Sequence, residues 1–296
     1  ASDADGASPQ FELEIVEGQG LTRGTGEVTC ACAANDCVLI GTSTGALVRY
    51  DYSDDSDQNR TVIHLSKSGK HAVTRLWLDR SSMHAVAALE DRSSGSLEYA
   101  YVNTVTQSPR LLSKVKAALQ AAGDETVSVQ AVGWTDIHSA SAFLRGSGTA
   151  TGPMLLGTSR GEFFEYAVDE SEKKERAPKL LYELPEREVI YGIEFSAVGG
   201  GGGGGGDPNV LVVAITSTRC YFFSGGTTFE GIFSQVSRDY EGGDGLLSFL
   251  ELPGQSCTGE LHLYRNLVGL PQYLTWMAAP GLFHGQMKVP GPEDKA

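Results

Sequence analysis

Residues 131–168 read A-V-G-W-T, a polar insertion, and then G-P-M-L-L-G-T-S-R-G-E-F-F-E-Y-A-V. Without the insertion, this part of the chain predicts three strands: an alternating segment at 127–134, an apolar run at 153–158 and an aromatic-rich segment at 161–168. The last two are joined by T-S-R-G, whose serine and glycine favour a hairpin turn. Three such strands and a further one at 179–184 form the unit of a β-propeller blade.

Similar strand patterns recur along the chain. The first strands of the predicted repeats begin at Val28, Val73, Val127 and Val189, roughly 45 to 60 residues apart, which is propeller-like spacing. No G-H or W-D dipeptides punctuate the repeats, so an ordinary WD40 array is not expected. The repetition predicts an all-β protein, a β-propeller of about five to six blades of four-stranded antiparallel sheet, with an incomplete ring. Such a ring exposes an apolar blade face at each end.

The domain organisation follows from composition. We expect a disordered polar lead-in at residues 1–10, one propeller domain at 11–288 and a polar tail at 289–296. Eight glycines at 199–206 predict a flexible loop inserted between two strands. They lack the following lysine and helix of a phosphate-binding loop.

The remaining strands are predicted from short alternating or apolar runs. The segment at 110–116 is expected to run into a short helix at 113–122, with Gly123 as its C-terminal cap. The segment at 228–235 is expected to be the fourth strand of the fourth blade, and 246–252 to belong to a later one. The full set of further strands is 11–16, 28–32, 37–41, 46–52, 61–65, 73–78, 84–89, 97–102, 189–195, 210–216, 220–224, 260–264 and 273–285.

The charge of the chain restricts its partners. Lys and Arg number 23 against 37 Asp and Glu, so the net charge is −14. Binding to nucleic acid or directly to an anionic bilayer needs basic patches, and neither is expected here. The longest apolar run, Val210–Ile215, is far shorter than the roughly 20 residues of a membrane span. Five cysteines and the absence of a signal-peptide pattern favour a reducing, cytoplasmic location.

Two segments resemble metal sites only superficially. Cys30, Cys32 and Cys37 lie close in sequence, but a structural zinc site needs four ligands and no histidine is near. We expect buried core cysteines. Residues 55–59 begin like a calcium loop, but Arg60 stands where that loop needs glycine. The sequence therefore predicts no metal and no cofactor.

No catalytic residue is predicted. The six histidines are scattered, none pairs with a Ser or Cys nucleophile in a known local motif, and no G-x-S-x-G occurs. Trp77, Trp134 and Trp276 are expected to pack between blades. A propeller hydrolase would need metal-binding carboxylates or an arginine cluster around its channel, and neither is visible as a motif. We therefore expect a protein that is not an enzyme and has no small-molecule substrate.

Several blocks of the chain resemble one known family. They are G-W-T with G-P-M-L-L-G-T-S-R-G-E-F-F-E, V-T-R-L-W-L-D-R-S-S-M-H-A-V-A-A-L at 73–89, V-V-A-I-T-S-T-R-C-Y-F-F-S-G at 212–225, and T-W-M-A with residues 281–285. In order and spacing they resemble the deep orange family, the vacuolar protein sorting-associated protein 18 (Pep3-type) group. The resemblance extends from about Val28 to Met287.

The resemblance implies a non-enzymatic role. Members of this family are subunits of the vesicle-tethering complexes HOPS and CORVET, and the matching part is their N-terminal β-propeller. Protein–protein contact with other tethering subunits is therefore expected, on the cytosolic face of late endosomes, lysosomes or vacuoles, with membranes reached through partners. The family's C-terminal α-solenoid and RING zinc domain have no counterpart in these residues, so ligase activity and zinc binding are not carried over. The alternative is a cytosolic β-propeller scaffold of another complex.

Overall fold

The computed structural model describes residues 20–287 except 21, 54–58, 67, 122–126, 136–150, 170–173, 199–208, 242–246, 253–255, 267–269 and 280. Several sequence predictions lie outside the described residues: the lead-in at 1–10, the strand at 11–16, most of the acidic loop at 55–59, the cap at Gly123, the glycine run at 199–206 and the tail at 289–296.

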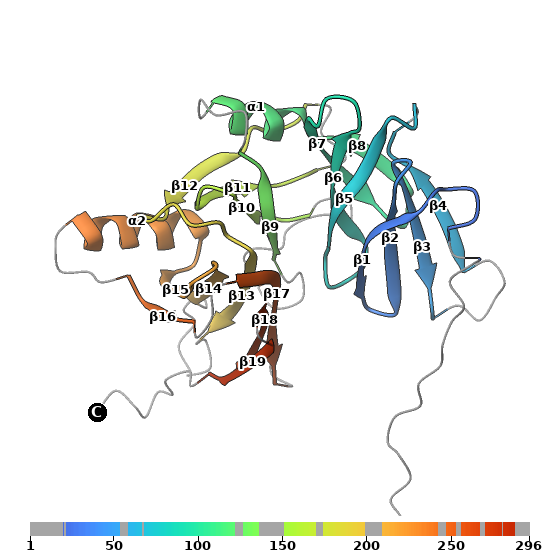
Figure 1. Ribbon diagram of the computed structural model, residues 1–296. Helices are drawn as coiled ribbons and strands as arrows, with labels where there is room; N and C mark the ends of the chain where they lie inside the picture. The colour runs from blue at the N-terminus through green and yellow to red at the C-terminus, as the bar shows by residue number, and fades with distance from the viewer. Residues whose placement is uncertain are drawn as a thin grey trace, which may run out of the picture.

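Five antiparallel sheets follow one another around an arc, as Figure 1 shows. Each sheet is a meander in which strands that are consecutive in sequence pair with one another. Four sheets have four strands and the fifth has three. Among the described residues no strand of the fifth sheet pairs with one of the first, so strand pairing does not close the ring. The predicted all-β propeller of five to six blades is confirmed with five.

The first two sheets are formed by residues 28–111, and they contain the strands predicted for this part of the chain. The first hairpin turns at Asn35 and Asp36, whose φ angles of 45° and 56° fit a two-residue primed turn. The first sheet consists of β1 (Val28–Ala34), β2 (Cys37–Thr42), β3 (Ala46–Asp51) and β4 (Arg60–His64), and the second of β5 (His71–Leu78), β6 (His84–Asp91), β7 (Leu97–Asn103) and β8 (Ser108–Leu111). The helix predicted after the second sheet is α1 (Ser113–Ala121).

The residues that first indicated a propeller blade form the third sheet. The two later sheets follow, and the last strand of the fourth is short. The third sheet consists of β9 (Val129–Trp134), β10 (Met154–Thr158), β11 (Glu162–Tyr166) and β12 (Lys179–Glu183), the fourth of β13 (Gly192–Val198), β14 (Asn209–Ile215), β15 (Arg219–Gly226) and β16 (Phe249–Glu251), and the fifth of β17 (Ser256–Arg265), β18 (Pro271–Ala279) and β19 (Gly281–Gln286).

The strand predicted at 228–235 is wrong, because this segment belongs to helix α2 (Phe229–Glu241). Its buried residues Phe229, Ile232 and Phe233 recur at helical spacing and lie on one face of the helix. Thr228 precedes the helix and accepts a hydrogen bond from the Gly231 amide at 3.1 Å, as an N-cap residue does. The fourth strand of this sheet is β16, so the segment at 246–252 belongs to the fourth blade and not to a later one.

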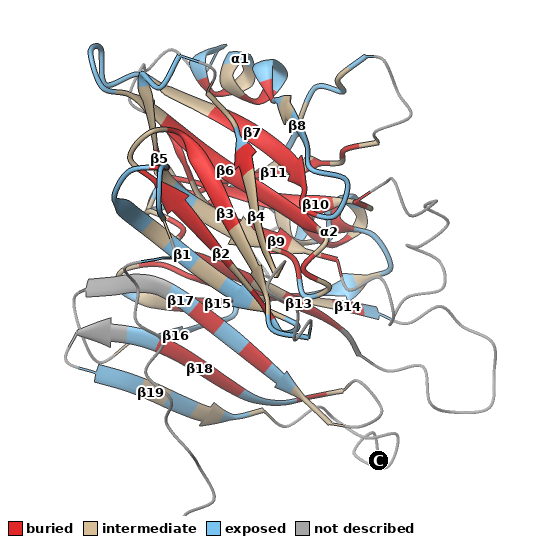
Figure 2. Cartoon of the chain, turned by 90° about the vertical axis from the view of Figure 1, so that its right-hand side faces the viewer, coloured by how far each residue is buried: buried red, intermediate tan, exposed pale blue. Residues whose placement is uncertain are grey.

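The core consists of apolar layers between successive sheets. Four clusters of buried side chains fill the four interfaces between neighbouring sheets. The helices complete two of them: Val115 and Leu119 of α1 pack between the second and third sheets, and Phe233 of α2 packs between the third and fourth. Figure 2 shows that buried residues concentrate in the middle of the arc and thin out in β17–β19.

Glycines let the third and fourth sheets approach closely. A Cβ atom on Gly157 would lie 2.6 Å from Ile190 Cγ2 and 2.9 Å from Ile193 Cδ1. The space at Gly133 is equally small, because a Cβ atom added there would lie 2.6 Å from Ile193 Cγ2. Real Cβ contacts are longer, so these two positions need glycine for sheet packing.

Candidate protein-interaction surfaces

The first strand of every sheet faces the centre of the arc. Residues of β1, β5, β9, β13 and β17, with Val38 of β2 and with Tyr191 and Arg80 just outside the first strands, line a central channel with a volume of about 980 Å³. The lining is mixed, with Trp77 and Trp134 beside charged groups such as Arg75 and Glu194. The channel is where a propeller enzyme would hold its catalytic groups, so its charges decide what it can do.

The cationic side chains of the channel are bound by the chain itself. Arg80, in the turn after β5, reaches across to Glu194 Oε2 of β13 at 2.7 Å and to the Leu263 carbonyl of β17 at 3.3 Å. Arg75 donates to the side chain of Gln130 on the neighbouring β9. These contacts connect sheets with one another, and each guanidinium is already hydrogen-bonded. The two channel arginines therefore link different sheets to one another in this structure.

The three early cysteines share one face of the first hairpin. Cys30 and Cys32 are half-buried against the core between the first and second sheets, and Cys37 is buried, as expected for core cysteines. Burial raises the pKa of the Cys32 thiol to about 12, so it stays protonated and is a poor metal ligand. Within the part of the chain that the structure describes, no three His, Cys, Asp or Glu side chains gather closely enough to hold a metal ion.

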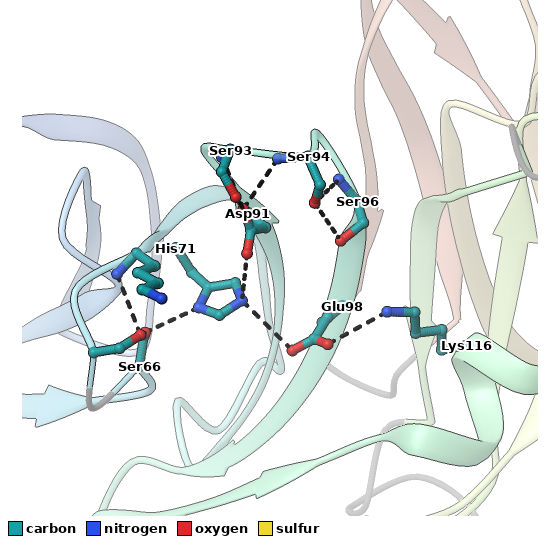
Figure 3. Close-up of polar contacts among 10 residues, drawn as sticks. Ser66, His71, Asp91, Ser93, Ser94, Ser96, Glu98 and Lys116 are labelled. Carbon is teal, nitrogen blue, oxygen red and sulfur yellow. Dashed lines mark hydrogen bonds and ion pairs between the residues drawn. The ribbon is translucent and has the colours of Figure 1, made fainter.

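A polar network joins the first two sheets to α1, as Figure 3 shows. His71 Nδ1 lies 3.0 Å from Ser66 Oγ, while Nε2 faces Asp91 at 3.8 Å and Glu98 at 3.7 Å. Glu98 also accepts from Lys116 Nζ of α1 at 3.3 Å. The network contains the residue types of a hydrolase triad, but its acids lie beyond hydrogen-bond distance of the imidazole.

Asp91 has a structural task in this network. Its carboxylate accepts hydrogen bonds from the Ser93 hydroxyl and from the backbone amides of Ser93, at 2.7 Å, and Ser94, at 3.1 Å. These hydrogen bonds lower the pKa of Asp91 to about 2. The acid thus caps the turn between β6 and β7. Sequence reasoning did not find this network because its members come from five separate segments and form no local motif.

One sheet face exposes large apolar side chains. Along β17–β19, alternate residues pack against the fourth sheet, and Leu263, Leu274 and Trp276 are buried there. The opposite residues point outward and are more than a third exposed: Tyr264, Tyr273, Met277 and Leu282. We call these four the fifth-sheet face. They form two cross-strand pairs, Tyr264 with Tyr273 and Met277 with Leu282, on either side of Thr275 and His284. Exposed apolar side chains gathered on one face indicate an interaction surface.

The first sheet differs from the fifth. Ile40 and Val48 point away from the second sheet, yet their exposed fractions are only 5% and 0%. The expectation of an exposed apolar face at each end of the arc is therefore wrong for the centre of the first sheet, where Ile40 and Val48 lie, although Val28 of β1 is 56% exposed. The expectation holds for the fifth sheet. The three tryptophans pack between sheets as predicted, with Trp77 and Trp134 in one cluster and Trp276 in another.

Comparison with known proteins gives the family. The model of the Pep3/Vps18/deep orange beta-propeller domain matches residues 9–296. The chain belongs to this family. The resemblance inferred from the four sequence blocks is therefore confirmed, and the match covers the predicted propeller domain and the tail.

Curated relatives of this family member come from plants and animals. "Vacuolar sorting protein 18" of Arabidopsis thaliana is 29% identical over 279 residues, which cover 93% of this chain and 25% of the relative. "Vacuolar protein sorting-associated protein 18 homolog" of Danio rerio is 27% identical over 274 residues, covering 88% and 25%. The chain thus spans about a quarter of the length of these relatives.

A solved structure supports the fold. A chain in the complex of KlAtg21 with the coiled-coil of AgAtg16 superimposes with a TM-score of 0.51 at 9% identity, covering 90% of this chain and 67% of that one. This likeness concerns the fold alone. No helix among the described residues of this Pep3/Vps18/deep orange propeller is long and apolar enough to cross a membrane.

Proposed function

We propose that this chain is the propeller of a non-enzymatic subunit in a vesicle-tethering complex of the HOPS or CORVET type. The observation that carries the proposal is the family match over residues 9–296, together with relatives named as vacuolar sorting proteins. In this role the propeller binds other tethering subunits on the cytosolic side of late endosomes, lysosomes or vacuoles. Membranes are reached through those partners.

The fifth-sheet face supports a role in protein contact. Tyrosine and methionine, which are enriched at protein interfaces, supply much of its exposed area, and Leu282 is 69% exposed. Tyr273 stacks on His284 with ring centroids 5.1 Å apart, so part of the surface is ordered before any partner binds. The net charge of −14 favours partners with basic surfaces and disfavours direct contact with anionic lipid.

The channel also supports a non-enzymatic role. A hydrolase of propeller type would direct cations or metal-binding carboxylates at a substrate. Here Arg80 and Glu194 are paired with each other, and Arg75 is bound to Gln130. Their hydrogen bonds connect different sheets, so these side chains have a structural role in the channel.

Affinity purification from cells with a tagged chain tests the proposal, with bound proteins identified by mass spectrometry. We expect other tethering subunits to be recovered, and Leu282→Lys to reduce their recovery by at least about ten-fold, because a lysine would be desolvated in the interface. The matched control is Leu180→Lys on β12, a leucine that is 45% exposed outside this face. Recovery of a different complex would favour the alternative scaffold role, and an unchanged yield with Leu282→Lys would exclude the fifth-sheet face.

A further inference from the structure

The imidazole of His71 lies where several segments of the chain meet. His71 begins β5, Ser66 belongs to the connection between the first and second sheets, Asp91 ends β6 and Glu98 lies in β7. The two acids are on the same face of the second sheet as His71, because His71 pairs with Asp91, and Glu98 pairs with Leu89 two residues earlier in β6. The ring is thus placed between a hydroxyl group and two carboxylates (Figure 3).

The two ring nitrogens have different partners. Nδ1 lies 3.0 Å from Ser66 Oγ, whereas Nε2 lies 3.8 Å from Asp91 Oδ2 and 3.7 Å from Glu98 Oε2. A neutral imidazole has one N–H group, and a protonated imidazole has two N–H groups and a positive charge. Only the charged form can make ion pairs with both carboxylates while it keeps its contact with Ser66.

The charges that face the ring are balanced when it is protonated. Asp91 and Glu98 supply two negative charges, and Lys116 of α1, 3.3 Å from Glu98, supplies one positive charge. Their sum is −2 + 1 = −1 with a neutral imidazole and −1 + 1 = 0 with a protonated one. The side chains of His71 and Asp91 are only 20% and 21% exposed, so solvent screens their attraction less than on an open surface.

Neighbouring charged residues do not face the imidazole in the same way. Glu90 pairs with Ala72 and therefore belongs to the opposite face of the second sheet. Lys70 and Arg92 are exposed in the adjoining turns, where solvent and salt screen their charges. From the first sheet's side, the described polar contact is the Ser66 hydroxyl.

We propose that His71 is a pH-dependent clamp that, when protonated, pairs with Asp91 and Glu98 at once and fastens the β6–β7 turn, α1 and the connection from the first sheet to one another. Histidine is the side chain whose charge ordinarily changes between about pH 5 and 8. The partners are assembled only in the folded chain, so this stabilisation is present in mildly acidic solution and is lost as the pH rises. The pKa of Asp91 is lowered to about 2, so this partner stays charged at pH 5.5.

Thermal unfolding at pH 5.5 and pH 8.0 tests the clamp with His71→Gln, which keeps a polar side chain that cannot be charged. We expect this variant to lower Tm by about 1–3 °C more at pH 5.5 than at pH 8.0. The matched control is His64→Gln, an exposed histidine at the end of β4 with no acidic partner among the described residues. Its effect should be the same at both pH values.

The double variant Asp91→Asn/Glu98→Gln shows whether the two carboxylates are responsible. In this background His71→Gln should change Tm equally at pH 5.5 and pH 8.0. Amide hydrogen exchange at pH 5.5 locates the effect, because His71→Gln should speed exchange in α1 by at least about three-fold relative to the wild type at the same pH.

Two results would overturn the proposal. If His71→Gln lowers Tm by the same amount at both pH values, or by more at pH 8.0, His71 has a structural role that does not depend on its charge. If the pH dependence persists in the double variant, it does not arise from Asp91 and Glu98.

Discussion

Truncation of Phe233 to alanine should strongly destabilise the propeller. Phe233 lies on α2, has an exposed fraction of 0%, and its ring centroid is 5.1 Å from that of Phe163 of β11 and 5.6 Å from that of Tyr182 of β12. It also lies 5.1 Å from Phe223 of β15, so one side chain contacts both the third and the fourth sheet. Large-to-small substitutions of buried phenylalanine cost about 3–5 kcal/mol. In a chain of this size each kcal/mol lowers Tm by about 2–4 °C, so a decrease of about 6–20 °C follows.

Urea and thermal unfolding followed by circular dichroism measure the effect. Tyr240→Ala on the same helix is the control, because its side chain is 51% exposed and its loss should change stability by less than about 0.5 kcal/mol. Phe233→Leu should fall between the two, since leucine fills part of the space. A loss below about 1 kcal/mol for Phe233→Ala would refute the argument that α2 holds the two sheets together.

Four further outcomes are expected. Gly157→Ala should cost about 1–3 kcal/mol by overpacking against Ile190, whereas Gly281→Ala, with no atom within 4 Å of the added Cβ, should be nearly neutral in the same denaturation assay. Because the folded state lowers the pKa of Asp91 to about 2, this carboxylate stabilises the fold at a pH above its pKa of about 3.9 in the unfolded chain, and the stabilisation is lost as the pH falls toward 2. The difference in urea midpoint between the wild type and Asp91→Asn should therefore shrink over that pH range. Shortening the glycine run at 199–206 to two residues should leave Tm unchanged or slightly higher, since loop closure changes by only about 0.6 kcal/mol per doubling of length, and a large loss in a thermal melt would contradict this. In a sedimentation assay at physiological salt the isolated chain should not bind protein-free anionic liposomes, and tight binding would exclude membrane contact through partners alone.

Strands with a strong local pattern could be predicted from the sequence. The hairpin of the third sheet was found because its apolar run, turn and aromatic segment are adjacent in the chain. The helix α2 was missed because its apolar residues lie in a short segment after Thr228, where strand and helix patterns are hard to distinguish. Because a propeller blade needs a fourth strand at that point, the segment was predicted as a strand and not as a helix.

The surfaces could be predicted less well than the strands. Exposure of Tyr264 or Leu250 depends on which sheet lies opposite, and a strand pattern shows alternation without showing what covers each face. The contacts of Arg80 and His71 join residues far apart in sequence, so no spacing rule reveals them. The burial of Ile40 and Val48 at the first sheet was missed for the same reason.

The reach of Arg80 across the channel has a consequence for folding. Sheets stacked side by side interact mainly with their neighbours, and such assemblies can gain or lose end units one at a time. Arg80 joins the second sheet to Glu194 and to the Leu263 carbonyl, which are 114 and 183 residues further along the chain. Contacts at such separations form late, because loop closure must come first. Loss of the fifth sheet would therefore remove a hydrogen bond made by Arg80 of the second sheet, so these two sheets are linked although they are not consecutive in the arc.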